Sequence, residues 1–336
     1  MTFMKKFDVY AIGNALLDIE YHATPQTLSE MGIDKGVMTL IDEQRQHDLM
    51  SRLNNSHEKM TCGGSAANTI IALSQLGAKA HFDCRVSSDD SGQVYADDLH
   101  DSGVHSNLDS KPLPAGITGK CLVFVTPDAD RTMNTFLGVS ADLDADDVDS
   151  EAIRSSGYVY IEGYLASSAN TRDAGIEARR IAEELGIKTS ITLSDPNMVR
   201  FFRDNLEAMI GERVDLLFAN EDEALELAQT DDLESAIELF KRLARSFAIT
   251  RGKQGALLFD GQSMIEIKPT VVDAIDTLGA GDMFAGAFFY GLSQGMSYAQ
   301  AGDLASSSAA RLVTRFGPRL EAAETRAVLA AFKAGN

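Results

Sequence analysis

Tryptophan is absent from the 336 residues, and cysteine occurs only at Cys62, Cys84 and Cys121. An odd number of widely spaced cysteines excludes a disulfide framework and a Cys-x-x-Cys metal site, and it favours a reducing compartment. No apolar run approaches the roughly 18 residues that a membrane span needs. Acidic residues soon interrupt the segment after Lys5 and Lys6, which excludes a signal peptide. These absences predict a soluble, cytoplasmic protein without a membrane partner.

Positive charge is also scarce. Lysine and arginine number 30 against 50 aspartates and glutamates, which gives a net charge of −20. Such a surface repels nucleic acid, so we expect no nucleic-acid partner. It repels phosphate as well, so a phosphate-bearing ligand needs a metal ion or a local group of hydrogen-bond donors. Apolar residues make up 44% of the chain, which is enough for a sizeable core.

Short apolar segments alternate with helical patterns along most of the chain. Near-continuous apolar strands between helices are typical of a mostly parallel sheet covered on both faces. Turn residues divide the β-rich segment 111–138, which predicts an excursion that contains a hairpin. We predict strands at 7–12, 158–163, 187–193, 214–220, 247–250 and 256–260, and helices at 63–77, 280–295 and 298–315. The pattern indicates one α/β domain with a small β-rich excursion.

Polar or glycine residues follow the ends of several predicted strands. In sheets of this kind, ligands bind beyond the carboxyl ends of the strands. We therefore expect a site at one rim of the sheet, formed at the strand ends marked by Asn14, Gly163, Asp195, Asn220 and Gly252.

The segment DTLGAGDMF (276–284) places bare backbone directly before an aspartate and a long apolar run. Gly279 and Gly281 free the backbone, and Asp282 suits a helix N-terminus, so a tight turn with a helix cap explains the segment. The same geometry directs N–H groups at one point, where an anion can bind. A Walker A motif is absent, and Phe284 stands where a dinucleotide fingerprint needs glycine.

Two further predicted helix starts carry polar residues. In CGGSAANTI, Gly63 and Gly64 allow a ligand close to the backbone, and Asn68 either bonds a ligand hydroxyl or faces water. In ANEDEALEL, Asn220 and Glu223 lie in the first helical turn. Acidic residues there are stabilised by the helix dipole, and they can equally hold a hydrated Mg²⁺ ion.

Three loops contain further residues that could contact a ligand. Thr250, Gly252 and Gly255 lie between two strands, as a plain glycine turn or as a loop along a nucleotide. Asn197 follows Asp-Pro, which is a turn signal whatever the function. Arg131 lies in the excursion as a surface charge or as a ligand contact. The six histidines show no metal-ligand spacing.

Taken together, these motifs resemble the ribokinase-like (PfkB) kinases of sugars and nucleosides, over nearly the whole chain. GGSAANTIIALSQLG is similar to the N-terminal signature of that family, DTLGAGDMFAGAFFYGL to its C-terminal signature, and NEDE to its N-x-x-E magnesium motif. The resemblance implies a single kinase domain over 1–336. Its fold would be ribokinase-like α/β, with a small β-rich lid contributed by segments near 14–60 and 111–140.

The resemblance also implies an ATP-dependent phosphotransferase that uses Mg²⁺, with K⁺ as a further candidate cofactor near Asp276 and the VTRFGP segment. Asp282 would be the general base, beside an anion hole formed by the amides of Gly279, Ala280 and Gly281. The implied acceptor contacts are Gly63, Gly64, Asn68 and Arg131. The implied nucleotide and metal contacts are Asn197, Thr250, Gly252 and Gly255 for ATP, and Asn220 with Glu223 for Mg²⁺ through water.

The acceptor is indicated by a second resemblance. IGNALLDIE is similar to the N-terminal segment of adenosine kinases, where the residues matching Asn14 and Asp18 meet ribose hydroxyls and Tyr164 would face the base. The leading hypothesis is an adenosine kinase that converts adenosine to AMP, as a monomer or homodimer. RTMNTFLG and DPN-x-x-R also occur in sugar kinases, so ribose, fructose and ketodeoxygluconate remain alternative acceptors.

Two other classes are weighed against a kinase. A non-catalytic nucleotide-binding regulator has no reason to keep Asp282, the loop glycines and Glu223, all of which are present. A dinucleotide-dependent oxidoreductase lacks its glycine fingerprint here.

Overall fold

The computed structural model describes residues 5–53, 59–127 and 131–335, which form two β-sheets and their covering helices. The larger sheet has the order β14-β13-β12-β11-β10-β9-β1-β5-β6. Its neighbouring strands are parallel except for the pairs β12–β13 and β13–β14. The strands are β1 (Phe7–Ile12), β5 (Ala80–Asp83), β6 (His105–Ser106), β9 (Ser156–Ile161), β10 (Lys188–Thr192), β11 (Val214–Asn220), β12 (Ala244–Thr250), β13 (Ala256–Phe259) and β14 (Met264–Ile267). The prediction of a mostly parallel sheet is confirmed.

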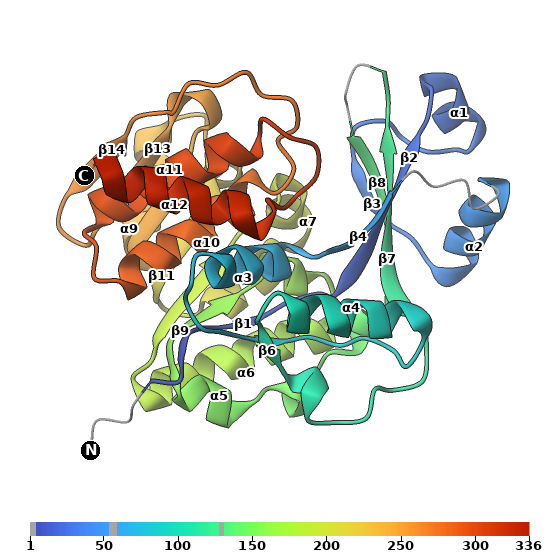
Figure 1. Ribbon diagram of the computed structural model, residues 1–336, viewed down its shortest axis with the longest axis horizontal. Helices are drawn as coiled ribbons and strands as arrows, with labels where there is room; N and C mark the ends of the chain where they lie inside the picture. The colour runs from blue at the N-terminus through green and yellow to red at the C-terminus, as the bar shows by residue number, and fades with distance from the viewer. Residues whose placement is uncertain (1–4, 54–58, 128–130, 336) are drawn as a thin grey trace.

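Helices cover both faces of this sheet, as Figure 1 shows. Val9 and Ala11 of β1 join one hydrophobic cluster, whereas Tyr10 and Ile12 join the other, because successive side chains of a strand point to opposite faces. The first cluster packs under α3 (Ser65–Gln75), α4 (Asp90–Asp101), α10 (Ala280–Ser293), α11 (Tyr298–Leu312) and α12 (Ala322–Gly335). The second packs under α5 (Ser150–Arg154), α6 (Ala169–Leu185), α7 (Pro196–Ile210), α8 (Glu221–Ala228) and α9 (Leu233–Leu243).

The second sheet, which we call the lid sheet, projects from the α/β body (Figure 1). Its order is β3-β8-β7-β2-β4, and β7 and β8 form the antiparallel hairpin predicted within 111–138. Helices α1 (Pro25–Glu30) and α2 (Glu43–Arg52) cover its outer face through a small separate core that includes Leu28 and Leu49. The strands are β2 (Leu16–His22), β3 (Met38–Leu40), β4 (Lys59–Gly63), β7 (Thr118–Val125) and β8 (Arg131–Gly138).

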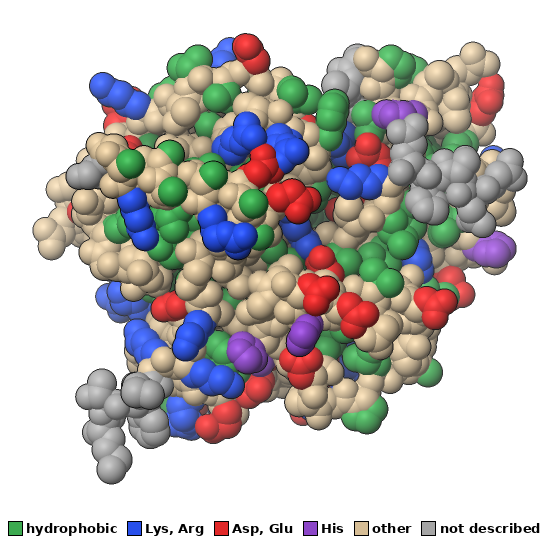
Figure 2. Space-filling view, viewed as in Figure 1, with side chains coloured by type: hydrophobic (Ala, Val, Ile, Leu, Met, Phe, Trp, Pro, Cys, Tyr) green, Lys and Arg blue, Asp and Glu red, His purple; other side chains and the backbone are tan. Residues whose placement is uncertain are grey.

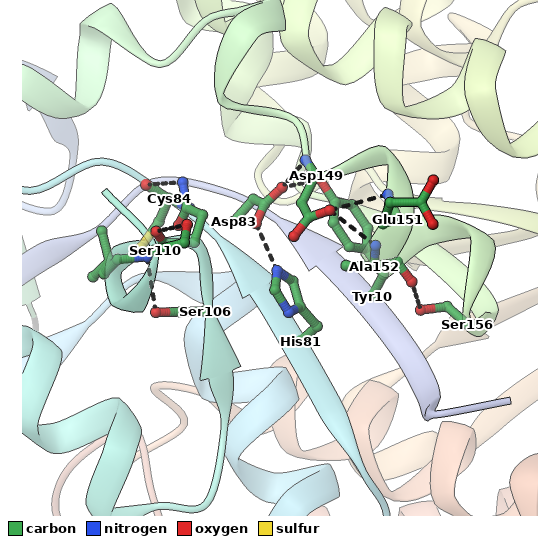
Figure 3. A network of polar contacts seen from close by, with 12 residues as sticks. Tyr10, His81, Asp83, Cys84, Ser106, Ser110, Asp149, Glu151, Ala152 and Ser156 are labelled. Atoms are coloured by element: carbon green, nitrogen blue, oxygen red, sulfur yellow. Dashed lines mark hydrogen bonds and ion pairs between the residues drawn. The ribbon is translucent and has the colours of Figure 1, made fainter. Parts of the chain in front are cut away.

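A buried carboxylate joins three elements on the face of the sheet that α5 covers. Tyr10 donates to Asp83 Oδ2 at 2.5 Å, and the Asp149 amide donates to the same oxygen at 2.6 Å. His81 Nε2 lies 2.8 Å from Asp83 Oδ1 (Figure 3). Asp149 in turn caps α5. Because a buried carboxylate is stable only when hydrogen-bonded, the network fixes the carboxyl end of β1, which leads directly to Asn14.

Charged side chains of both signs lie on the molecular surface. On the face that Figure 2 shows, basic and acidic side chains are interspersed. Among the residues described, no helix is both long and apolar enough to cross a membrane. The three cysteines are free and buried, as expected from their spacing.

Helices α3 and α10 approach each other at Gly286. A Cβ atom there would lie 2.9 Å from Ala72 Cβ and 3.2 Å from the Leu73 amide nitrogen of α3, and closer still to the Thr69 carbonyl. Only a glycine therefore permits this helix crossing. Because both helices begin at the rim of the sheet, the contact brings their first turns together.

We predict that Gly286→Ala lowers the free energy of unfolding by about 1–3 kcal/mol, because an extra methyl group in a tight contact forces backbone movement. Urea unfolding followed by circular dichroism measures this loss. The matched control is Gly335→Ala, where an added Cβ atom meets nothing within 4 Å. Equal stability of the two variants would contradict the proposed contact.

Candidate active site

A cavity of ≈ 570 Å³ opens where the lid sheet faces the carboxyl ends of the central strands. It combines residues from the strand ends, the start of α10 and the inner face of the lid sheet. Most of the predicted site residues line it, namely Asn14, Asp18, Gly64, Asn68, Arg131, Tyr164, Asn220, Glu223, Thr250, Gly252, Gly279, Ala280, Gly281 and Asp282. The size is typical of a pocket for small molecules.

Three predicted residues lie elsewhere. Gly63 packs against Asp18, whose Cγ would lie 2.5 Å from an added Cβ atom. Gly255 packs against the backbone at the end of β14, at Ile267 and Pro269. Asn197 lies in the first turn of α7, where its amide donates to Asp195 Oδ1 at 2.7 Å, and Asp195 lines the cavity in its place. In this structure Gly63 and Gly255 serve close packing, and Asn197 lies behind the cavity wall.

Asp282 is held by two donors from α3. Ser65 Oγ donates to Asp282 Oδ1 at 2.6 Å, and Asn68 Nδ2 donates to Oδ2 at 2.9 Å. Burial raises the pKa of Asp282 to about 6, while both hydrogen bonds and the charge of Arg319 oppose that rise. A carboxylate with such a pKa is ionised at neutral pH and can still accept a proton, as a general base must.

The start of α10 has the geometry expected of an anion site. Gly279 is the N-cap with φ of +75°, a left-handed conformation that favours glycine. An added Cβ atom at Gly281 meets nothing within 4 Å, so an anion can approach this backbone from the cavity. The amide of Ala280 donates to the Thr277 carbonyl at 3.2 Å. The Gly279 and Gly281 amides are therefore the principal candidates for the anion hole.

The cavity also contains the carboxyls of Asp18, which is half-buried, and Glu162, which is buried. Burial raises the pKa of Asp18 to about 7, and the charges of Arg319 and Arg131 oppose the rise. Burial likewise raises the pKa of Glu162 to about 7. Glu162 accepts from Asn14 Nδ2 at 3.3 Å and from the Ala66 amide at 2.8 Å, so it links β1 to the start of α3. These groups offer acceptors to ligand hydroxyls.

Asn220 and Glu223 form a capping box at the start of α8. The Asn220 backbone amide and Nδ2 donate to the two Glu223 oxygens at 3.0 and 2.7 Å. Burial raises the pKa of Glu223 to about 8. In the part of the chain that the structure describes, no group of three or more acidic, histidine or cysteine side chains could hold a metal. The site fits Mg²⁺ bound largely through water, because that ion retains several waters.

Arg131 connects the lid sheet to the body. Its guanidinium lies 3.3 Å from Glu20 Oε2 on β2 and 2.6 Å from Asp276 Oδ2. The Gly317 amide also donates to Asp276 Oδ2, at 2.8 Å. The side chain thus lies at the cavity wall with its charge already balanced by two carboxylates.

The inner face of the lid sheet is mainly apolar. Asp18 pairs with Cys121, which pairs with Thr135, so residues at alternate positions of these strands share one face. The opposite face carries Ile19, Leu122 and Phe124 into the core below α1 and α2. The lid residues that line the cavity are Leu16, Asp18, Met38, Leu40, Cys121, Arg131, Met133, Thr135 and Leu137.

Ser65, Glu162 and Arg319 lie near Asp282 and were not singled out from the sequence. Ser65 follows the two glycines of CGGSAANTI, so its place at a helix start was a usable signal. Glu162 directly precedes Gly163 at a predicted strand end, where a carboxylate is unusual within an apolar segment. Arg319 lies 37 positions after Asp282 by their residue numbers, and no pattern in the sequence marks it.

Known proteins share this architecture. The sequence matches the pfkB family carbohydrate kinase profile over residues 31–326. The crystal structure of a probable sugar kinase protein from Rhizobium etli is 34% identical, with a TM-score of 0.88 and 99% of both chains covered. Adenosine kinase from Sinorhizobium meliloti is also 34% identical with a TM-score of 0.88, over 97% of this chain and 99% of that one.

Curated sequences point to another acceptor. The 5-dehydro-2-deoxygluconokinase of Clostridium perfringens is 25% identical over 324 residues, which cover 92% of this chain and 88% of that protein. What these relatives share is the ribokinase-like α/β fold and kinase activity on a small molecule. The chain therefore belongs to the pfkB family of carbohydrate kinases, which are phosphotransferases that act on a sugar or a nucleoside.

Proposed function

We propose that the protein transfers a phosphoryl group from ATP to the hydroxymethyl group of a nucleoside, and that adenosine is the acceptor. The proposal rests on the contrast between apolar and polar residues that line the cavity. The inner face of the lid sheet offers Met38, Leu40 and Met133, whereas the opposite side offers polar groups such as Asn14. A nucleoside has the matching division, with a flat base at one end and ribose hydroxyls at the other.

The charges in the cavity support a neutral acceptor. Arg131 is the only lysine or arginine among the described residues that line it, and that side chain is bound to Glu20 and Asp276. A sugar acid needs a cationic partner for its carboxylate, because burying an unpaired charge costs roughly several kcal/mol. The carboxyls of Asp18 and Glu162 would also repel a sugar acid.

The chemistry proposed for the site requires positioning and charge stabilisation more than covalent catalysis. Asp18 accepts hydrogen bonds from hydroxyls of the phosphoryl acceptor, and Asn14 can donate to them as well as accept from them. Asp282, held by Ser65 and Asn68, takes the proton of the attacking hydroxyl. The amides of Gly279 and Gly281, at the positive end of α10, stabilise the charge on the transferring group.

Nucleotide and metal binding are assigned to the other end of the cavity. Thr250 and Gly252 would lie along ATP, and Asn220 with Glu223 would hold Mg²⁺ through water. When bound, Mg²⁺ neutralises phosphate charge, which the acidic surface makes necessary. Each Glu223 oxygen accepts one bond from Asn220, which leaves further lone pairs for such a water.

A sugar or sugar-acid kinase is the second candidate. It is favoured by the similarity to 5-dehydro-2-deoxygluconokinase. In that case Asp282 and the anion site would keep their roles, and Tyr164 and the apolar lid residues would not contact a base.

We predict that adenosine supports faster ADP release from Mg-ATP than inosine, ribose, fructose or ketodeoxygluconate, each tested at micromolar to millimolar concentration. A coupled ADP assay measures this. Faster turnover of a sugar or sugar acid would transfer the assignment to the second candidate. The absence of turnover with every acceptor would refute the nucleoside proposal.

Asp282→Asn should fold normally, because it preserves side-chain size and polarity, and its turnover should fall by about 10²–10⁴-fold, the usual contribution of a general base. The same ADP assay gives the rate, and circular dichroism tests the fold. Asp204→Asn, at an exposed position of α7, is the matched control. A near-normal rate for Asp282→Asn would show that another group accepts the proton.

We also predict a fall in kcat/KM as the pH decreases through about 7, steepening below about 6, because Asp18 and Asp282 must both be ionised. Both pKa values are raised by burial, so activity is present above them and is lost on protonation. The kcat/KM–pH profile of Asp18→Asn should lose the step that belongs to Asp18 and retain the step near the pKa of Asp282. An unchanged profile in that variant would contradict the role of Asp18.

A further inference from the structure

Arg319 reaches the base through a chain of hydrogen bonds. It lies in the segment before α12, and its Nε donates to Asn68 Oδ1 at 2.7 Å. Its Nη1 donates to Asp98 Oδ2 on α4 at 2.6 Å. The next bond in the chain is the one from Asn68 Nδ2 to Asp282 Oδ2, at 2.9 Å. Arg319 does not itself line the cavity.

This arrangement determines which way the Asn68 amide points. A guanidinium can only donate hydrogen bonds, and an ionised carboxylate can only accept them. With Arg319 on one side and Asp282 on the other, the oxygen of Asn68 must face the arginine and the nitrogen must face the aspartate. The flipped amide would place donor against donor and acceptor against acceptor. The second N–H of Asn68 remains available to a ligand hydroxyl.

We infer that Arg319 is a positioning residue for the reaction: it orients the Asn68 amide toward Asp282 and keeps the base ionised. The inference rests on the proposed role of Asp282 as the base. A hydrogen bond donated to a carboxylate favours its ionised form, and so does a nearby positive charge. Arg319 supplies the second effect directly and the first through Asn68.

The other ionisable groups around Asp282 make this assistance necessary. The charge of Asp282 interacts with six other ionisable groups: Asp18 on β2, Glu162 after β9, Glu223 on α8, Tyr160 on β9, Tyr164 in the η4 turn (Gly163–Ser167) and Arg319. Except for Arg319, these groups are acidic or neutral, so they disfavour a negative charge on Asp282. Arg319 is the cation of this group.

The hydrogen bonding of Arg319 is incomplete. Nη2 is buried without a hydrogen-bond partner among the described residues. An unsatisfied buried donor costs free energy. The cost is understandable if the side chain is placed to satisfy Asn68 and to bring its charge near Asp18 and Asp282.

The test compares Arg319→Met with the wild-type protein by two measurements. The first is the kcat/KM–pH profile for whichever acceptor the wild-type enzyme phosphorylates. The second is a ¹³C NMR titration of the aspartate carboxyl carbons, in which the Asp282 signal is assigned by its loss in Asp282→Asn. We expect the pKa of Asp282 and the acidic limb of the profile to rise by roughly one pH unit. The Asp18 signal, followed separately, should rise as well.

Arg326→Met is the matched control, since it removes the same charge from an exposed position on α12. Arg319→Lys, which keeps the charge but not the planar fork, should show a smaller rise than Arg319→Met and covers the case in which the latter does not fold. An Asp282 pKa equal to that of the wild type in Arg319→Met, or in Arg319→Lys if only that variant folds, would overturn the inference. If no acceptor is phosphorylated, the proposed function fails, and the NMR titration still decides this inference.

Discussion

The close crossing of α3 and α10 is the constraint on which the site depends. At Gly286 the two helices pack backbone against backbone, and this brings the start of each to the same point on the sheet rim. Ser65 and Asn68 then meet Asp282, more than two hundred positions away along the chain. If Asp282 is the base, as we propose, its two fixed donors spare it from reorganising during the reaction, which is the main advantage of a preorganised site. A larger residue at the crossing would loosen this geometry without altering any catalytic group.

The second constraint is electrostatic. Asp18, Glu162, Glu223 and Asp282 are carboxyls with pKa values raised by burial, and they surround a cavity in a chain of net charge −20. Such a cavity repels a phosphate donor unless positive potential is built into it. The start of α10 provides one source, and a bound divalent metal provides another. Arg319 and Arg131 provide fixed charges, both already paired with carboxylates. The cavity is therefore acidic around these carboxyls, and the start of α10 together with a metal would make it favourable to phosphate.

Local patterns in the sequence predicted the body of the fold well. The strands at 7–12 and 214–220 have the predicted bounds, because continuous apolar segments end at turn residues. The short strands β3 and β4 were not predicted individually, since a few residues at a sheet edge leave no periodicity. For the site, Asp282 and Asn68 were predicted as separate candidates, but their contact depends on a helix crossing that no local pattern encodes. Arg319 was missed because no pattern in the sequence marks it, whereas Glu162 stands at a predicted strand end and could have been found. Gly63 and Gly255 were predicted as ligand contacts, and the structure shows them in close packing.

The two sheets divide the work of such an enzyme. The groups proposed for the chemistry come from α3 and α10 of the body, whereas most of the apolar wall comes from alternate residues of the lid strands. Changing the inner face of the lid sheet leaves the core below α1 and α2 untouched, because the two use opposite sides of the same strands. The ion pair of Arg131 with Asp276 joins the lid to the segment that leads into α10. In the proposed function, this separation lets one fold serve sugar and nucleoside kinases alike: the lid would select the acceptor, and the proposed base would remain where the two helices cross.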